Sequence, residues 1–230
     1  ANEALSRAHN LTSANSISIG RFLPQMTYWA RAALYACAET GIAPGLIIPT
    51  GNLGNAFAAV LARACGLPIG PVVLATNANA TLSDWFASGQ YSGRASIATL
   101  ANAMDVGAPS NFERLAGLPV GQIADVVRVD DAAIRNRIRA SFDQAGYIAC
   151  PHTATALEAW YRLENAARTE RRWIIGATAH PAKFADTVEP VIGDNVPLPP
   201  ALQAVLERPV RCRDIEADLA GLSHILATLG

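Results

Sequence analysis

A strand, a turn and a helix follow one another directly between residues 45 and 66. The strand and the turn read Leu46-Ile47-Ile48-Pro49-Thr50-Gly51-Asn52-Leu53-Gly54-Asn55. The short apolar run predicts a buried strand near 46–49, and the glycines and asparagines after it tolerate backbone angles with positive φ. Bulky apolar residues then recur at helical spacing from Ala56 to Cys65, with Arg63 expected on the outside, until Gly66 ends the helix.

The turn at residues 51–55 suits an anionic ligand. A glycine-rich turn before a helix leaves backbone N–H groups without partners beside the positive end of the helix dipole. A Walker motif would need a lysine here, and a dinucleotide fingerprint would need an acidic residue after the next strand, where Thr76 and Asn77 stand. The turn therefore predicts a phosphate group held by backbone amides, and a phosphorylated cofactor such as pyridoxal phosphate would suit it. An ordinary turn without a ligand is the alternative.

The composition indicates a soluble globular protein, with 51% hydrophobic and 16% charged residues among 230. A net charge of −1 without a basic tract argues against nucleic acid and anionic membrane surfaces as partners. The chain shows neither a membrane-spanning apolar run nor a signal peptide at its start, so a cytoplasmic protein is expected. The spacing of histidines and cysteines predicts no metal site, and buried free thiols are expected at Cys37, Cys65, Cys150 and Cys212.

Three further strands are expected near 72–76, 124–129 and 173–177. Because they alternate with helices, they predict a three-layer α/β/α fold with a mainly parallel sheet. Residues 77–120 show no sustained period, and we expect several short helices there that help to cover the site. Further helices are predicted to begin near Phe22, Asp130, Pro151, Pro181, Pro200 and Asp214.

Three arginines lie close together on the helix that is predicted to begin at Asp130. Its apolar stripe is formed by residues that are four apart, up to Phe142. Arg135, Arg137 and Arg139 are expected to form its solvated face and not a binding site.

Seven segments together resemble the carboxyl-terminal part of threonine synthases, pyridoxal-phosphate enzymes of the tryptophan-synthase-β fold group. The resemblance runs in order from about residue 10 to the end. It implies a fold-type II enzyme fold and makes residues 1–230 the carboxyl-terminal part of the large cofactor-binding domain. The segments are Ser13-Ala14-Asn15-Ser16-Ile17-Ser18-Ile19-Gly20-Arg21, Pro49-Thr50-Gly51-Asn52-Leu53-Gly54-Asn55, Ala75-Thr76-Asn77, Ala103-Met104-Asp105, Pro109-Ser110-Asn111-Phe112-Glu113-Arg114-Leu115, Pro151-His152-Thr153-Ala154 and Thr178-Ala179-His180-Pro181-Ala182-Lys183-Phe184.

The family converts O-phospho-L-homoserine and water into L-threonine and phosphate, and the resemblance implies roles in that reaction. Thr178 would bond the pyridine nitrogen of the cofactor as a neutral partner, although a helix cap is its alternative. Guanidinium and short polar donors would bind the substrate phosphate. For Arg21 the alternative is a surface charge. The cofactor phosphate would lie at Gly51, Asn52, Leu53, Gly54 and Asn55, and the substrate phosphate at Asn15, Ser16 and Arg21.

The sequence departs from the family at residues 18 and 53. Ser18 stands where asparagine is common, and Leu53 where phenylalanine is common. Neither change removes a backbone amide, so the predicted phosphate site is unaffected. We expect the Gly51–Asn55 turn, Thr178 and the Asn15–Arg21 segment to converge on one cleft, because loops after parallel strands gather at one edge of the sheet.

One lysine, Lys183, stands among the 18 basic residues. The family's Schiff-base lysine belongs to a segment before those present here, so no catalytic residue is assigned. This chain alone is expected to be inactive, with the missing amino-terminal part of the same protein as its partner. Lys183 is not expected to replace that lysine, because it follows Pro181 in the first turn of a helix and lies close to Asp186. A non-catalytic, synthase-like protein that binds a phosphorylated ligand and an α/β domain without a ligand remain the alternatives.

Overall fold

The computed structural model describes residues 2–12, 15–119, 121–210 and 212–229. They fall into two units, one of which is Ser16–Pro197 and the other Ala1–Asn15 with Leu198–Gly230. The terminal unit carries helices α1 (Glu3–Ala8), α10 (Pro200–Leu206) and α11 (Leu219–Leu229). Helix α10 begins where the sequence predicts, whereas α11 begins five residues after Asp214.

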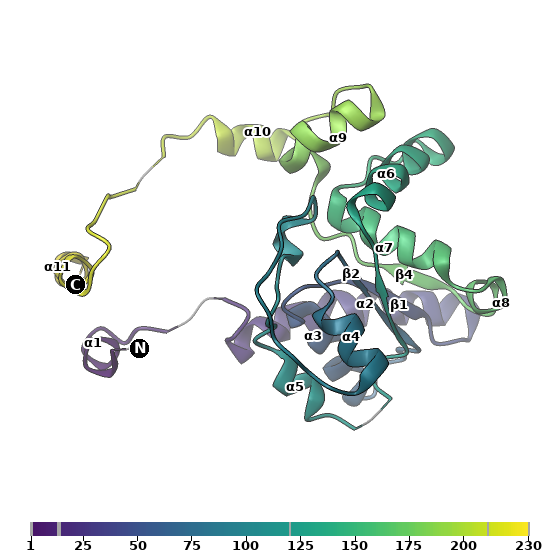
Figure 1. Ribbon diagram of the computed structural model, residues 1–230, viewed down its shortest axis with the longest axis horizontal. Coiled ribbons are helices and arrows are strands. Elements are labelled where there is room, and N and C mark those ends of the chain that lie inside the picture. The colour runs from purple at the N-terminus through teal and green to yellow at the C-terminus, as the bar shows by residue number, and fades with distance from the viewer. Residues whose placement is uncertain (1, 13–14, 120, 211, 230) are drawn as a thin grey trace. The chain divides into compact units, whose positions relative to one another are not determined.

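A parallel four-stranded sheet forms the centre of the Ser16–Pro197 unit (Figure 1). Its strand order is β3-β2-β1-β4, and every neighbouring pair is parallel, which confirms the predicted sheet. In the register, Ile47 lies beside Val73 on one side and Ile175 on the other. The strands are β1 (Gly45–Pro49), β2 (Val72–Thr76), β3 (Asp125–Arg128) and β4 (Trp173–Ile175).

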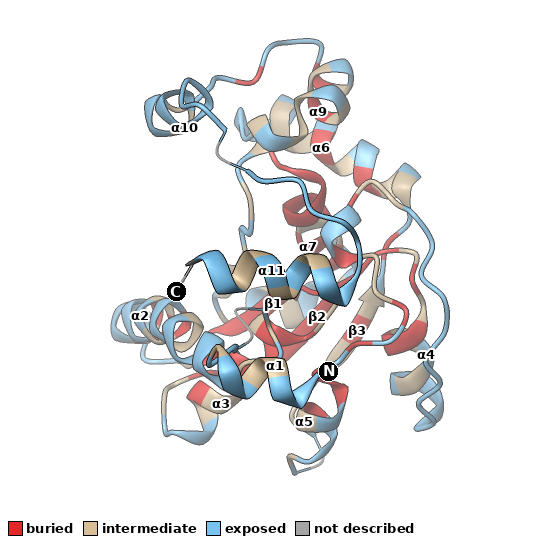
Figure 2. Ribbon diagram, turned by 90° about the vertical axis from the view of Figure 1, so that its left-hand side faces the viewer, coloured by how far each residue is buried: buried red, intermediate tan, exposed pale blue. Residues whose placement is uncertain are grey.

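Helices cover both faces of this sheet, as predicted. Leu46 and Ile48 of β1 pack with helices α2 (Phe22–Thr40) and α3 (Gly54–Ala64). Ile47 between them points to the opposite face, where it packs against helix α7 (Pro151–Arg162). Successive strand residues point to opposite faces, so a strand covered on both sides must be apolar throughout. Figure 2 shows β1 and β2 as buried strands between these helices.

Helix α3 is buried on more sides than the sequence predicts. Its small residues, Ala56, Ala58, Ala59 and Ala62, are all fully buried because the helix lies between the sheet and α2. Arg63 is not on the outside: it donates to the carbonyl oxygens of Gly70 and Gln122, and burial lowers its pKa. The expectation of buried thiols holds for Cys150 and is wrong for Cys65 and Cys212, which are exposed.

The expectation of a solvated arginine face is wrong for Arg137. Helix α6 (Asp131–Ala145) packs against α7, and this contact leaves the Arg137 side chain 14% exposed. Its guanidinium lies 2.8 Å from the Glu158 carboxylate and 3.6 Å from the centre of the Tyr161 ring. Both partners come from α7, which the local pattern of α6 does not reveal.

Residues 77–119 hold short helices, as predicted, joined by a polar network. Asp105 accepts hydrogen bonds from the side chains of Asn77 (2.7 Å), Asn79 (3.3 Å) and Thr99 (2.7 Å). This network gives an irregular segment a defined course. The helices here are α4 (Thr81–Ser88), η2 (Asn102–Met104) and α5 (Phe112–Ala116), and the remaining ones in this unit are η1 (Ile19–Arg21), α8 (Asn165–Thr169), η3 (Pro181–Phe184) and α9 (Ala185–Ile192).

None of the helices in the described ranges has the length and apolar character that crossing a membrane requires. Within the same ranges, no three histidine, cysteine, aspartate or glutamate side chains gather as the ligands of a metal would.

Candidate functional site

The turn between β1 and α3 presents a row of backbone amides. Leu53 has a φ of 64°, an uncommon angle for a residue with a side chain, and this side chain is fully buried in the core. The N–H groups of residues 51–55 find no acceptor among the described residues. These amides lie at the start of an eleven-residue helix, where the dipole favours negative charge. The turn therefore has the geometry of an anion site.

The two asparagines of the turn use their side chains to hold its shape. Asn52 donates to the Ser16 hydroxyl (2.6 Å) and accepts from the Ser110 amide (2.6 Å). Asn55 donates to the Pro49 carbonyl (2.8 Å) and accepts from the Thr50 hydroxyl (2.8 Å). The side chains thus bind protein, while the backbone amides of the turn stay available to a ligand.

Gly51 is needed because another part of the chain comes very close to it. A Cβ atom at this position would lie 2.7 Å from the Cα atom of Met104. The backbone at Met104 cannot move aside as a flexible side chain would, so helix η2 forms a firm support beneath the turn.

Asn111 is a buried residue that joins two parts of the site, and its role was not predicted. Its amide group donates to the carbonyl oxygens of Ser16 (3.0 Å) and Asn52 (2.9 Å) and accepts from Arg114. Arg114 also donates to the carbonyl of Ile17 (2.7 Å). The residue belongs to a segment that carries the family resemblance, but its partners lie 59 and 95 residues away in sequence. No local pattern could have revealed these contacts.

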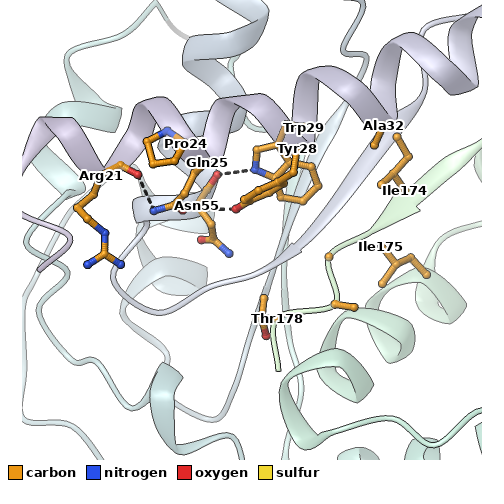
Figure 3. A pocket seen from close by; sticks show the side chains of 12 residues that line it. Arg21, Pro24, Gln25, Tyr28, Trp29, Ala32, Asn55, Ile174, Ile175 and Thr178 are labelled. Carbon is orange, nitrogen blue, oxygen red and sulfur yellow. Dashed lines mark hydrogen bonds between the residues drawn. The ribbon is translucent and has the colours of Figure 1, made fainter. Parts of the chain in front are cut away.

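A pocket of about 640 Å³ lies between α2 and the segment that follows β4 (Figure 3). Three of the predicted site residues, Arg21, Asn55 and Thr178, line it. Trp29 of α2 donates from Nε1 to the carbonyl of Asn55 (3.1 Å), which joins α2 to the first turn of α3. The structure thus places residues from three separate segments around one cavity.

The pocket has a polar rim and an aromatic wall. Gln25 donates to the carbonyl of Arg21 (3.1 Å), and the hydroxyl of Tyr28 donates to the Gln25 side chain (3.4 Å). Burial raises the pKa of Tyr28, so its phenol keeps its proton at neutral pH. The wall can therefore pack against a flat ring while the rim binds polar groups.

The pocket lining does not include five other predicted site residues of the same unit, which are Ser16, Gly51, Asn52, Leu53 and Gly54. Ser16 contacts the turn through Asn52, as described above. Asn15 belongs to the terminal unit, so its role remains a prediction. Lys183 is exposed in η3, two residues after Pro181, in the helical turn where the sequence places it.

Comparisons with known proteins identify relatives along the chain. A family model described as "Threonine synthase, C-terminal" matches residues 153–225. The threonine synthase of Serratia marcescens is 35% identical and the match covers 99% of this chain and 53% of that protein. The threonine synthase of Escherichia coli (strain K12) is 34% identical, with 97% of this chain and 53% of that protein covered.

Solved structures of threonine synthases share the fold. The structure from Escherichia coli superposes with a TM-score of 0.84 at 32% identity, covering 100% of this chain and 54% of that one. The structure of threonine synthase with bound PLP from Brucella melitensis gives a TM-score of 0.86 at 27% identity, covering 99% and 55%. The chain spans about half the length of the curated relatives it matches. In sequence and in fold, the chain is similar to threonine synthases over about half of their length, and its residues 153–225 match the carboxyl-terminal model of that family.

Proposed function

We propose that this chain is the carboxyl-terminal part of a pyridoxal-phosphate-dependent lyase that converts O-phospho-L-homoserine and water into L-threonine and phosphate. The observation that carries the proposal is the row of amides at residues 51–55, which have no acceptor among the described residues, beside the pocket lined by Thr178. The names of the relatives and the PLP-bound structure from Brucella melitensis support the cofactor and the reaction.

The residues present fit the phosphate end of this cofactor. Backbone amides at the start of α3 can hold a doubly charged phosphate without a lysine or a metal ion. The required close approach of η2 explains why Gly51 has no side chain. Asn52 and Asn55 keep the turn in place through their contacts with protein.

The part of the pocket that Thr178 and Trp29 line suits the ring of the cofactor. When bound, pyridoxal phosphate supplies an electron sink that stabilises negative charge on the substrate's carbons. The Thr178 hydroxyl lies at the exposed end of the segment after β4, where it can bond the ring nitrogen without adding charge. Trp29 lies on the neighbouring wall and excludes water from that side.

Arg21 and Ser16 are the proposed contacts of the substrate phosphate. Arg21 lines the same pocket, and a guanidinium can donate two parallel hydrogen bonds to a phosphate. Ser16 accepts a hydrogen bond from Asn52 of the turn, and this contact to the turn supports its proposed role. Asn15 is proposed as a third contact because the family resemblance includes it.

The lysine content favours a second candidate function for the chain by itself. In this function the chain binds a phosphorylated ligand without catalysis. Lys183 is the single lysine of the 230 residues, and it is exposed in η3. We propose that catalysis requires the amino-terminal part of the same protein, which would supply the lysine that binds the cofactor. A relative from Pongo abelii, 29% identical, is named "Threonine synthase-like 1".

Titration of the folded 230-residue protein with inorganic phosphate and with pyridoxal phosphate tests both candidates. We expect the two ligands to compete, because both would occupy the amides of the turn. Gly51→Ala should weaken both ligands, whereas Thr178→Val should weaken pyridoxal phosphate by about threefold to tenfold and leave phosphate unchanged. Thr169→Val, which removes another exposed hydroxyl far from the turn in sequence, is the matched control. A folded protein that binds neither ligand would refute the proposed site.

Borohydride reduction followed by peptide mapping tests the role of Lys183. We expect no stoichiometric labelling at this residue after treatment with pyridoxal phosphate. Specific labelling together with turnover of O-phospho-L-homoserine would show instead that this chain is an enzyme without its amino-terminal part.

A further inference from the structure

His152 is a buried histidine in the first turn of α7. Its side chain is 3% exposed, and its Nε2 atom accepts a hydrogen bond from the backbone amide of Ala103 at 3.1 Å. An accepting Nε2 carries no proton, so the proton of the neutral ring lies on Nδ1. That buried Nδ1 has no partner among the described residues. A buried donor without an acceptor costs free energy, so other contacts of the ring must offset that cost.

The contact with Ala103 continues to the phosphate turn. Ala103 belongs to η2, and the next residue, Met104, is the one whose backbone lies against Gly51. The Met104 side chain is 4% exposed and packs in the same apolar cluster as Ala154 of α7. A continuous series of contacts thus leads from the His152 ring through η2 to the turn.

Helix η2 is held at two points, one on each side of Met104. On the carboxyl-terminal side, Asp105 is anchored by the side chains of Asn77 and Thr99. On the amino-terminal side, Ala103 is held by His152, and the carbonyl of Ala101 accepts a longer hydrogen bond from Asn77 (3.3 Å). Removing the His152 contact would therefore weaken the attachment of η2 on the amino-terminal side of Met104.

We propose that His152 is a positioning residue of the phosphate turn, which holds η2 against Gly51 by accepting the hydrogen bond of the Ala103 amide. This inference rests on the proposed function, because it assigns His152 to the turn that would bind the phosphate. It adds a residue from the other side of the sheet to a site that is otherwise built from α2, α3 and the strand ends.

The role requires a neutral ring, since a doubly protonated imidazole has no lone pair to accept the bond. Burial lowers the pKa of His152, Asp105 acts in the opposite direction, and Lys183 lowers it further. Phe184 packs against the ring with a distance of 4.9 Å between ring centres, and it contributes no charge. The surroundings therefore keep the ring neutral near neutral pH.

Three variants of the full chain test the proposal by titration with inorganic phosphate. His152→Phe keeps an aromatic ring but removes the acceptor, and phosphate should bind about threefold to tenfold more weakly. His152→Gln restores an acceptor oxygen and should recover part of the affinity. Thr155→Val is the matched control, because Thr155 is equally buried in α7 and bonds the carbonyl of Pro151 instead of η2. Equal phosphate affinities in all variants would overturn the proposal.

Nuclear magnetic resonance supplies a test that does not depend on a ligand. The wild-type His152 ring should be protonated at Nδ1, and the amide signals of Gly51 and Gly54 should shift in His152→Phe but not in Thr155→Val. A ring protonated at Nε2, or unmoved glycine signals, would overturn the proposal. If the shifts are seen but wild-type protein binds no phosphate, the positioning contact is supported and the proposed function fails. If His152→Phe does not fold, two measurements still test the proposal: the phosphate affinity of His152→Gln, and which ring nitrogen of His152 carries the proton in the wild type.

Discussion

Replacing Asn111 by alanine should destabilise the Ser16–Pro197 unit and separate two parts of the proposed site. Asn111 is fully buried, and the substitution would remove its two donated hydrogen bonds and the one it accepts from Arg114. The carbonyl groups of Ser16 and Asn52 would lose their donor in a water-poor place. The effect should therefore exceed that of an ordinary surface substitution.

The size of the effect follows from these contacts. Each net hydrogen bond contributes about 0.5–1.5 kcal/mol, so three of them predict a loss of about 2–4 kcal/mol in the free energy of unfolding. Asn111→Asp should cost nearly as much, because a carboxylate keeps the contact with Arg114 but cannot donate to either carbonyl. Asn165→Ala removes an exposed amide that is bonded to Arg168, and it should cost less than about 0.5 kcal/mol.

Urea unfolding followed by tryptophan fluorescence measures this difference. All four tryptophans, Trp29, Trp85, Trp160 and Trp173, lie within Ser16–Pro197, so the signal reports on the unit that contains Asn111. A loss of less than about 1 kcal/mol for Asn111→Ala would refute the reasoning, since it would mean that the buried contacts contribute no more than one ordinary hydrogen bond.

Three further predictions concern other contacts of the same unit. Trp29→Phe keeps the buried ring but removes the donor to the Asn55 carbonyl, so it should cost about 1 kcal/mol in urea unfolding and weaken phosphate binding. Arg137→Ala leaves the Glu158 carboxylate mostly buried and should cost about 1–3 kcal/mol, and a double-mutant cycle with Glu158→Gln should show that the two changes are not additive. Burial lowers the pKa of His152 in the folded state, so the unfolded protein takes up the proton first as the pH falls. The free energy of unfolding should therefore decrease below about pH 6.5. His152→Phe should remove this part of the pH dependence, and a pH profile that is the same in the variant and the wild type would contradict the prediction.

The order of strands and helices could be read from the sequence because it depends on local patterns. The apolar run at Leu46–Pro49 and the helical spacing after Asn55 predict β1 and α3 close to their observed bounds. Alternation of such pairs is sufficient to predict a parallel sheet with helices on both faces. The turn at residues 51–55 was also predicted, but the reason given for it was wrong in detail: its residue with positive φ is Leu53, and neither the glycines nor the asparagines of the turn have a positive φ.

Contacts between distant segments were not predictable in this way. Arg137 looks solvated on its own helix and is covered by α7, while Arg63 looks exposed and is bonded to Gly70 and Gln122. A helical pattern shows which residues share a face, but not which element will cover that face.

The sequence by itself determined the strands, the helices that cover the sheet and the turn at residues 51–55, because backbone preferences and apolar spacing act over a few residues. Only the tertiary structure decided that Asn111 joins the turn to Ser16 and that His152 holds η2 against Gly51. These contacts connect residues that are 49 to 95 positions apart. Their partners come together only when the sheet and its covering helices pack, because burial then requires each polar group to find a partner within the assembled core.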